Sequence, residues 1–438
     1  MFISLIWLVC ILDWQWGNYA ISLLTNVCTA VPSCSFAVVS RLPNMKSIIS
    51  LHLGAAGLGL APSMWDLLTT ELQAEEVSRA FSEDSKGTRH PRALLVDLDF
   101  DHKAAILRNP LLSQVPYIAT VQGTGGYSMN AHYCIGKEIV DECLNGVRRS
   151  MEEADSVDGL VMLSSLNGGT GSGFTNLLLD RSEIMDIRSK MYILVLPTCD
   201  SVVEPYNFVL TASNLAEKND LIVCYDNKDT GKVALSMGME GGLAGVNSVI
   251  AQSLSHLYSQ KDDFPRSIGA LASSVARESL KFVVPSVSLG LGNGFNPETD
   301  VTRLEAALSQ GCCCAHTAKP SPQSCYLQFR GDWSLASAHD YLGRSSRSCD
   351  FSLYSHARPQ WRDWQAQSHS LLQLQAEPSF KLRLQRIARN FDQLYSKRSH
   401  VHWYMGLGMS EGEFGYAREE FARLIKAIEY GGLTGLQN

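Results

Sequence analysis

A glycine-rich stretch between two apolar segments is the part of the sequence best suited to bind a ligand. It reads LSSLNGGTGSGF from Leu163 to Phe174. Its centre is Gly168, Gly169, Thr170, Gly171, Ser172 and Gly173. Glycines let a backbone approach a ligand and turn its N–H groups inward, and a following helix presents a positive end to an anion. A plain strand-to-helix turn rarely needs four glycines in six positions, so we predict a phosphate loop. Gly171→Val is expected to block the ligand and leave the fold intact.

Two common phosphate loops do not match this stretch. A P-loop would end in Gly-Lys-Ser/Thr, but Phe174 follows Gly173 where the lysine should stand. A dinucleotide fingerprint needs another glycine at the position of Asn176, and no suitable acidic residue follows about 20 positions later. A dinucleotide-dependent oxidoreductase is therefore disfavoured, and the loop is of another kind.

Composition limits the classes of partner. The chain has 438 residues, 45% of them hydrophobic, which is enough for two or three packed domains. The net charge is −7 and no long basic run is present, so we expect no nucleic-acid partner. The 12 cysteines are too sparse for a disulfide framework and favour a reducing compartment such as the cytoplasm.

The first 44 residues differ from the rest. They begin MFISLIWLVCIL, which is too short to span a bilayer and has no basic residue before it. Met45 offers a second plausible start that leads straight into a strand. We expect residues 1–44 to be an extension or a mispredicted start, and we expect no membrane partner.

The loop must be positioned by an alternation of strands and helices. Apolar runs predict strands at 47–54, 93–101, 158–166, 191–198 and 221–227. Amphipathic stretches predict helices at 60–76, 135–154, 174–190, 245–260, 381–398 and 410–430. This alternation is typical of a doubly wound α/β sheet, which binds ligands beyond the carboxyl ends of its strands. Four candidate loops fall there: 54–57, 97–101, 167–173 and 201–207.

The glycine loop, taken with other motifs in order, resembles the tubulin family from about residue 47 to 430. These motifs are LHLGAAGLGLAPSMWD, LLVDLDFD, HYCIGKEIVDE, SVVEPYN and SKRSHVHWYMGLGMSEGEFGYARE. The last is independent support, because no phosphate site requires it. The resemblance implies a GTP-binding domain (45–240), a central helix (241–262), an α+β intermediate domain (263–378) and a C-terminal helical pair (379–438) without an acidic tail.

The resemblance also assigns site residues. It implies that GTP or GDP binds with Mg²⁺, and that the glycine loop holds the phosphates. Asn167 replaces the family's first glycine and tolerates left-handed backbone. The other implied contacts are Gly54, Ala55 and Ala56 in the first loop, Asp97 and Asp99 beside Mg²⁺, Glu204 near the ribose, and Asn227 and Asn247 on guanine. Ala55 and Gly59 stand where the family has glutamines, and Leu243 stands where an aromatic residue stacks on the base.

The resemblance finally implies head-to-tail assembly with other tubulin subunits in the cytoskeleton. Glu278 matches the acid that alpha-type tubulin presents to the neighbouring subunit's GTP, where it could orient or deprotonate water. Two segments, 285–330 and 330–402, are shorter than in the family. We therefore expect a minor tubulin of a basal-body or centriolar kind, with microtubule or centriolar partners. The alternative is a non-polymerising tubulin-like module that caps or nucleates microtubules with weak or no GTPase activity.

Overall fold

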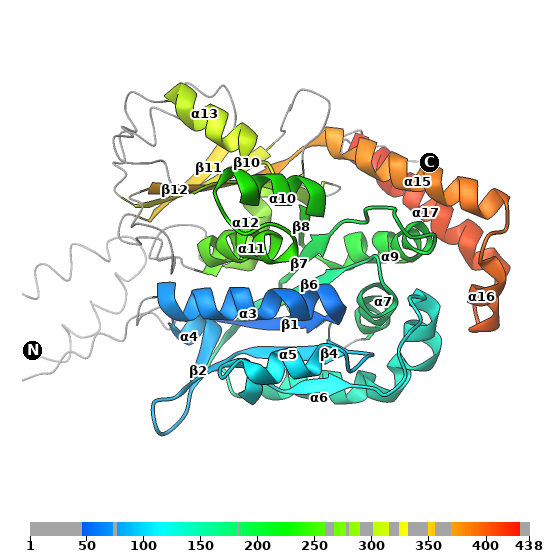
Figure 1. The fold of residues 1–438 in the computed structure, drawn as a ribbon, viewed down its shortest axis with the longest axis horizontal. Helices are drawn as coiled ribbons and strands as arrows, with labels where there is room; N and C mark the ends of the chain where they lie inside the picture. The colour runs from blue at the N-terminus through cyan, green and yellow to red at the C-terminus, as the bar shows by residue number, and fades with distance from the viewer. Residues whose placement is uncertain are drawn as a thin grey trace, which may run out of the picture. The chain divides into compact units, whose positions relative to one another are not determined.

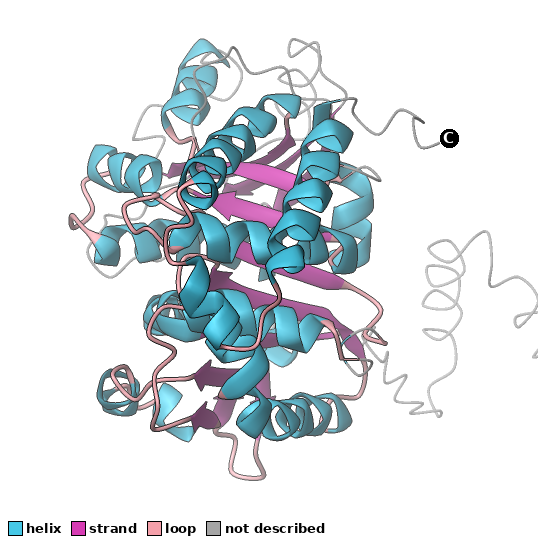
Figure 2. Ribbon diagram, turned by 90° about the vertical axis from the view of Figure 1, so that its right-hand side faces the viewer, coloured by secondary structure: helices cyan, strands magenta, loops and turns pink. Residues whose placement is uncertain are grey.

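A ten-stranded sheet forms the centre of the computed structural model, in the order β11-β10-β12-β9-β8-β7-β6-β1-β4-β5, with helices around it (Figure 2). Its strands are β1 (Ser47–Leu53), β4 (Ala93–Asp97), β5 (Tyr117–Ala119), β6 (Val157–Ser165), β7 (Lys190–Val195), β8 (Leu221–Tyr225), β9 (Phe282–Leu289), β10 (Ser324–Gly331), β11 (Cys349–Tyr354) and β12 (His369–Ala376). All pairs from β5 to β9 are parallel, and β12 runs antiparallel to β9 and β10. A separate hairpin is formed by β2 (Phe81–Glu83) and β3 (Arg89–Pro91). The predicted α/β class is confirmed.

The structure describes residues 46–72, 77–181, 184, 186–258, 267–276, 280–289, 301–314, 324–331, 349–354 and 369–429. Two predictions fall outside these residues: the extension at 1–44 and the role of Glu278. The sheet is continuous across the proposed boundary at residue 240, because β9 pairs with β8. The division into four domains stays a prediction.

The helices connect and cover these strands (Figure 1). They are α3 (Gly54–Glu71), α4 (Val77–Ala80), α5 (Lys103–Arg108), α6 (Gly136–Glu152), α7 (Thr175–Leu179), α9 (Glu204–Lys218), α10 (Asn227–Ser236), α11 (Leu243–Tyr258), α12 (Ile268–Val275), α13 (Val301–Gln310), α15 (Lys381–Ser396), α16 (Val401–Gly406) and α17 (Glu411–Glu429). Short 3₁₀ turns occur at Leu112–Gln114 and Pro378–Phe380, and π-helical turns at Asn130–Cys134 and Thr170–Phe174. α3 packs on α11, and α9 packs on α15 and α17.

Apolar patterning explains which elements are buried. All seven residues of β1 are buried, as expected for a strand covered on both faces of a parallel sheet. In α15, Leu384, Ile387 and Phe391 are buried at helical spacing, as the sequence predicted. Phe391 packs against Tyr206 of α9 with ring centroids 5.2 Å apart, and the C-terminal helices are held there by aromatic contacts.

Three predicted element boundaries were wrong. The expected loop at 54–57 is the first turn of α3, because Gly54 adopts φ +65° and turns the chain directly from β1 into the helix. The expected helix at 174–190 ends at Leu179, where Asn214 of α9 donates to the Asp180 carboxylate at 3.0 Å. The expected loop at 201–207 contains the start of α9 at Glu204.

The cysteines partly depart from the expected reduced state. Seven described cysteines are free thiols: Cys134, Cys143, Cys199, Cys224, Cys312, Cys313 and Cys314. Cys325 is disulfide-bonded. Within the described residues, no helix has both the length and the apolar character that a membrane span requires.

Two buried histidines make the stability depend on pH. His52 is fully buried; its Nδ1 donates to the Gly57 carbonyl at 2.9 Å and its Nε2 accepts from Trp65 at 3.1 Å. Burial lowers its pKa from 6.5 to about 4, and burial also lowers the pKa of His256. The unfolded chain therefore binds more protons than the folded chain between pH 6.5 and 4.

We expect the free energy of unfolding to fall as the pH drops from 7 to 5, with about 2 kcal/mol of the loss due to His52. Denaturant titrations at both pH values would measure this loss. His52→Gln should reduce the pH dependence by that amount, and an equal dependence in the variant would contradict the assignment.

Candidate functional site

A cavity of about 800 Å³ opens at the carboxyl ends of β1, β4, β6, β7 and β8. Thirteen residues predicted from the sequence line it: Gly54, Ala55, Ala56, Asp97, Asp99, Asn167, Gly168, Gly169, Thr170, Gly171, Asn227, Leu243 and Asn247. They come from segments far apart in the chain. They meet because the carboxyl ends of parallel strands lie at the same edge of a sheet.

Three predicted residues do not line this cavity: Ser172, Gly173 and Glu204. The Ser172 hydroxyl donates to the Gly168 carbonyl at 2.5 Å. Gly173 packs so closely that an added Cβ would lie 1.8 Å from the Ser128 carbonyl oxygen. The Glu204 carboxylate accepts from the Cys199 backbone N–H at 2.7 Å. The polar side chains of Ser172 and Glu204 are thus hydrogen-bonded within the protein, and Gly173 lies in close contact with Ser128.

Close packing requires three of the four loop glycines, Gly169, Gly171 and Gly173. A Cβ on Gly171 would lie 2.0 Å from the Ser165 carbonyl oxygen, and one on Gly169 would lie 2.4 Å from Thr124 Oγ1. A Cβ on Gly168 would meet no atom within 4 Å. Neither Asn167 nor the loop glycines have positive φ, so the tolerance of asparagine for left-handed backbone is not needed at this position. The expectation that Gly171→Val leaves the fold intact is also wrong, because the new side chain would displace the end of β6.

A second glycine loop faces the first and was missed in the sequence. Thr124, Gly125 and Gly126 line the cavity, and both glycines have positive φ, +62° and +82°. Consecutive N–H groups in such turns can form an anion-binding concavity. The only sequence signal was the short GTGG at 123–126, and the short strand β5 that precedes it was not predicted.

The acidic side of the cavity contains three aspartates and a histidine. Asp97 is buried, and His102 Nδ1 lies 3.3 Å from its Oδ2. Burial raises the pKa of Asp97, while His102 and the Thr170 hydroxyl act to lower it. Asp101 and His102 also line the cavity and were not predicted as site residues.

The donor set fits Mg²⁺ bound together with phosphates. Mg²⁺ takes hard oxygen ligands and is usually held by one or two carboxylates, with phosphate oxygens and water completing its coordination. Asp97 and Asp99 offer two such carboxylates next to the glycine loop. No group of three or more His, Cys, Asp or Glu side chains in the described part of the chain is arranged to hold a metal alone.

The other end of the cavity is less polar. It is lined by Leu60, Leu243 and Ile250 together with Asn227 and Asn247. The Asn247 side-chain N–H donates to the Gly59 carbonyl at 2.9 Å, which leaves its Oδ1 as an acceptor toward a ligand. Leu243 is 68% exposed, so it offers a partly open apolar surface where a planar ring could pack.

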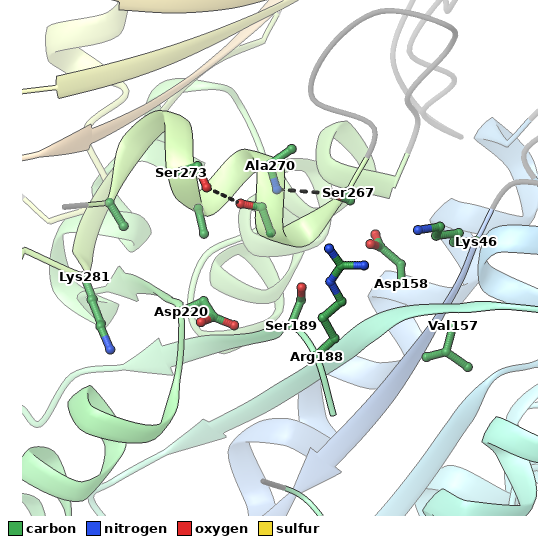
Figure 3. Close-up of a pocket in the computed structure, with 13 residues that line it drawn as sticks. Lys46, Val157, Asp158, Arg188, Ser189, Asp220, Ser267, Ala270, Ser273 and Lys281 are labelled. Carbon is green, nitrogen blue, oxygen red and sulfur yellow. Dashed lines mark hydrogen bonds between the residues drawn. The ribbon is translucent and has the colours of Figure 1, made fainter. Parts of the chain in front are cut away.

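A second cavity, of about 620 Å³, lies at the amino ends of the strands, on the opposite edge of the sheet (Figure 3). Both of its carboxylates already serve the fold. Asp158 accepts from Arg79 at 3.2 Å and from the Ile268 N–H at 3.0 Å. Asp220 accepts from the Lys190 N–H at 2.7 Å. The first cavity is therefore the better candidate for a nucleotide, since open parallel sheets bind ligands at their carboxyl edge.

Fold and cavity together define an α/β protein of the nucleotide-binding type. The profile of the Tubulin/FtsZ family, GTPase domain, matches residues 47–235. The tubulin alpha chain of Encephalitozoon cuniculi is 27% identical in an alignment of 436 positions that covers 87% of this chain and 96% of that protein. The tubulin alpha-1B chain of Physarum polycephalum is 28% identical in an alignment of 440 positions that covers 88% of this chain and 96% of that protein. The tubulin alpha-1 chain of Arabidopsis thaliana is 26% identical in an alignment of 446 positions that covers 90% of this chain and 98% of that protein.

Over most of its length the chain is therefore similar to alpha-tubulins, and residues 47–235 match the GTPase domain of the Tubulin/FtsZ family. The resemblance stated from the sequence is confirmed.

Proposed function

We propose that the cavity at the carboxyl edge binds GTP or GDP together with Mg²⁺. One observation supports this most: the cavity places two glycine loops, two carboxylates and two asparagines around one space. The N–H groups of the glycine loops suit the phosphates, and the asparagine amides offer the donor and acceptor edges that guanine requires. When bound, Mg²⁺ would neutralise phosphate charge beside Asp97 and Asp99.

Protein purified from Met45 onward is expected to carry guanine nucleotide with Mg²⁺. Denaturing the protein and separating the released nucleotide by chromatography would test this, and elemental analysis would detect the metal. Recovery of adenine nucleotide or NAD, or of no nucleotide after gentle purification, would contradict the proposal.

We further propose head-to-tail assembly with tubulin-type subunits in the cytoplasm, with GTP hydrolysed at the junction by a mechanism that uses Glu278. That residue lies outside the described part of the chain. Ala276 and Lys281, which stand on either side of 277–279, line the cavity at the amino edge. The nucleotide cavity is at the opposite edge. In the proposed mechanism one subunit supplies the glutamate and its neighbour supplies the GTP, as the sequence resemblance implies. A basal-body or centriolar location remains part of this proposal.

A second candidate function is a non-polymerising module that caps or nucleates microtubules. Ala55 and Gly59 line the cavity without a side chain that could contact phosphate or metal, which favours weak nucleotide binding. Sedimentation with alpha/beta tubulin would separate the two functions. Co-pelleting at a substoichiometric ratio would favour capping, whereas stoichiometric incorporation would favour a polymer subunit.

A further inference from the structure

The side chain of Asn207 joins three separate segments of the protein. It is fully buried at the end of the first turn of α9. Its Nδ2 donates to the Gly126 carbonyl and to the Asn167 carbonyl, both at 2.8 Å. Its Oδ1 accepts from the Ser128 N–H at 3.0 Å and from the Tyr404 hydroxyl at 2.8 Å. Every hydrogen-bonding position of the amide is thus used.

Two of these partners belong to the walls of the nucleotide cavity. Gly126 lies in the second glycine loop and Asn167 begins the first, and both line the cavity. The loops already touch, since there is no room for a Cβ on Gly169 beside Thr124. One buried amide bonded to both carbonyls therefore sets their separation, and with it the positions of the N–H groups around the phosphates. Leaving such a hydrogen bond unmade costs free energy, because its donor and acceptor are buried away from water.

A third partner is the Ser128 backbone N–H, and the fourth, Tyr404, belongs to α16. Tyr404 is fully buried, and its ring packs on Tyr127, the residue after Gly126, with centroids 5.3 Å apart. Burial raises the pKa of Tyr404, so its hydroxyl stays a neutral donor to Asn207. α16 thus reaches the cavity loops through the hydrogen bond from Tyr404 to Asn207 and through ring contacts of Trp403 and Tyr404 with Tyr127.

We propose that Asn207 is a positioning residue for the nucleotide cavity, and that Tyr404 couples nucleotide binding to the packing of α16. The inference rests on the proposed function of the cavity. Coupling between two sites is reciprocal: loosening α16 weakens nucleotide binding, and bound nucleotide stabilises α16. The C-terminal helices can therefore register whether the cavity is occupied.

The chain offers a matched control for Tyr404. Tyr206 is fully buried in the same aromatic cluster, with its ring 5.5 Å from that of Tyr404. Its hydroxyl donates to the Ser399 carbonyl at 2.9 Å and makes no contact with Asn207 in the described structure. Tyr206→Phe and Tyr404→Phe each remove a hydrogen-bonded hydroxyl from the same cluster, but only the second removes a bond to Asn207.

The experiment measures GTP affinity and hydrogen exchange in the full chain. Tyr404→Phe should weaken GTP binding about 3- to 10-fold, and Asn207→Asp by about 10-fold or more, because a carboxylate cannot donate to the two carbonyls. Tyr206→Phe should bind GTP like the wild type. Amides at 401–409 should exchange more slowly when GTP is added to the wild type, and this protection should be reduced in Tyr404→Phe.

Three outcomes would overturn the inference. In the first, Tyr404→Phe and Asn207→Asp fold and bind GTP with wild-type affinity. In the second, Tyr206→Phe weakens GTP binding as much as Tyr404→Phe, which would indicate a general loosening of the aromatic cluster that both tyrosines share. In the third, GTP does not change exchange at 401–409. If the wild-type protein binds no GTP, the proposed function itself is overturned. This result differs from the three outcomes above because it is seen without any substitution.

Discussion

Gly168→Val is expected to abolish most GTP binding while the protein stays folded. A Cβ at this position meets no atom within 4 Å, so the fold tolerates a side chain there. The position lines the cavity, and a branched side chain would occupy the space that a phosphate needs. Loss of one or two charge-assisted hydrogen bonds, at about 1.5–3 kcal/mol each, corresponds to roughly 100-fold weaker binding.

Calorimetric titration with GTP in the presence of Mg²⁺ would measure this effect, with thermal unfolding to verify the fold. Gly415→Val is the matched control, since a Cβ at Gly415 also meets no atom within 4 Å and Gly415 lies in α17, away from the cavity. Gly171→Val serves as a contrast and should destabilise the protein, because its Cβ would overlap the Ser165 carbonyl oxygen. Wild-type affinity in folded Gly168→Val would show that the loop does not hold phosphate.

Glu278→Ala is expected to leave GTP binding by the monomer unchanged and to slow hydrolysis during assembly. The proposed substrate of this glutamate belongs to the neighbouring subunit, so the isolated monomer should not use it. Residues that orient or deprotonate water typically contribute roughly 10²–10⁴-fold to a rate, and a loss of that size should appear in GTP turnover. The measurement is phosphate release in a mixture that assembles, compared with release from the monomer.

Glu217, a glutamate in the described part of the chain, provides the control. It is the second-last residue of α9, its side chain is 72% exposed, and its carbonyl accepts from Lys281 at 3.2 Å. Glu217→Ala should assemble and hydrolyse GTP like the wild type. If Glu278→Ala also matches the wild type in an assembling mixture, Glu278 is a surface residue without a role in hydrolysis. Rapid hydrolysis by the monomer would exclude the interfacial mechanism.

Local patterns in the sequence were sufficient to predict the strands of the parallel core and the loops that form much of the cavity wall. Apolar runs predicted β1, β4, β6, β7 and β8, because strands buried on both faces need continuous apolar segments. Polar and glycine residues after those strands then had to meet, since the carboxyl ends of parallel strands share one edge. This is why Asp97 and Gly168 could be placed around one site without a structure, whereas Asn227 was assigned through the family resemblance.

Tertiary structure alone decided how the cavity is built and what supports it. The loop at Thr124–Gly126 and the bridge from Asn207 to Tyr404 depend on contacts between residues up to 197 positions apart, which no local pattern encodes. The reason for glycine at 171 is likewise a contact with the end of β6 and not a backbone angle. Residue type and spacing determine which groups can reach an edge of the sheet, whereas close packing among distant segments determines which of them face the cavity and which hold it in shape.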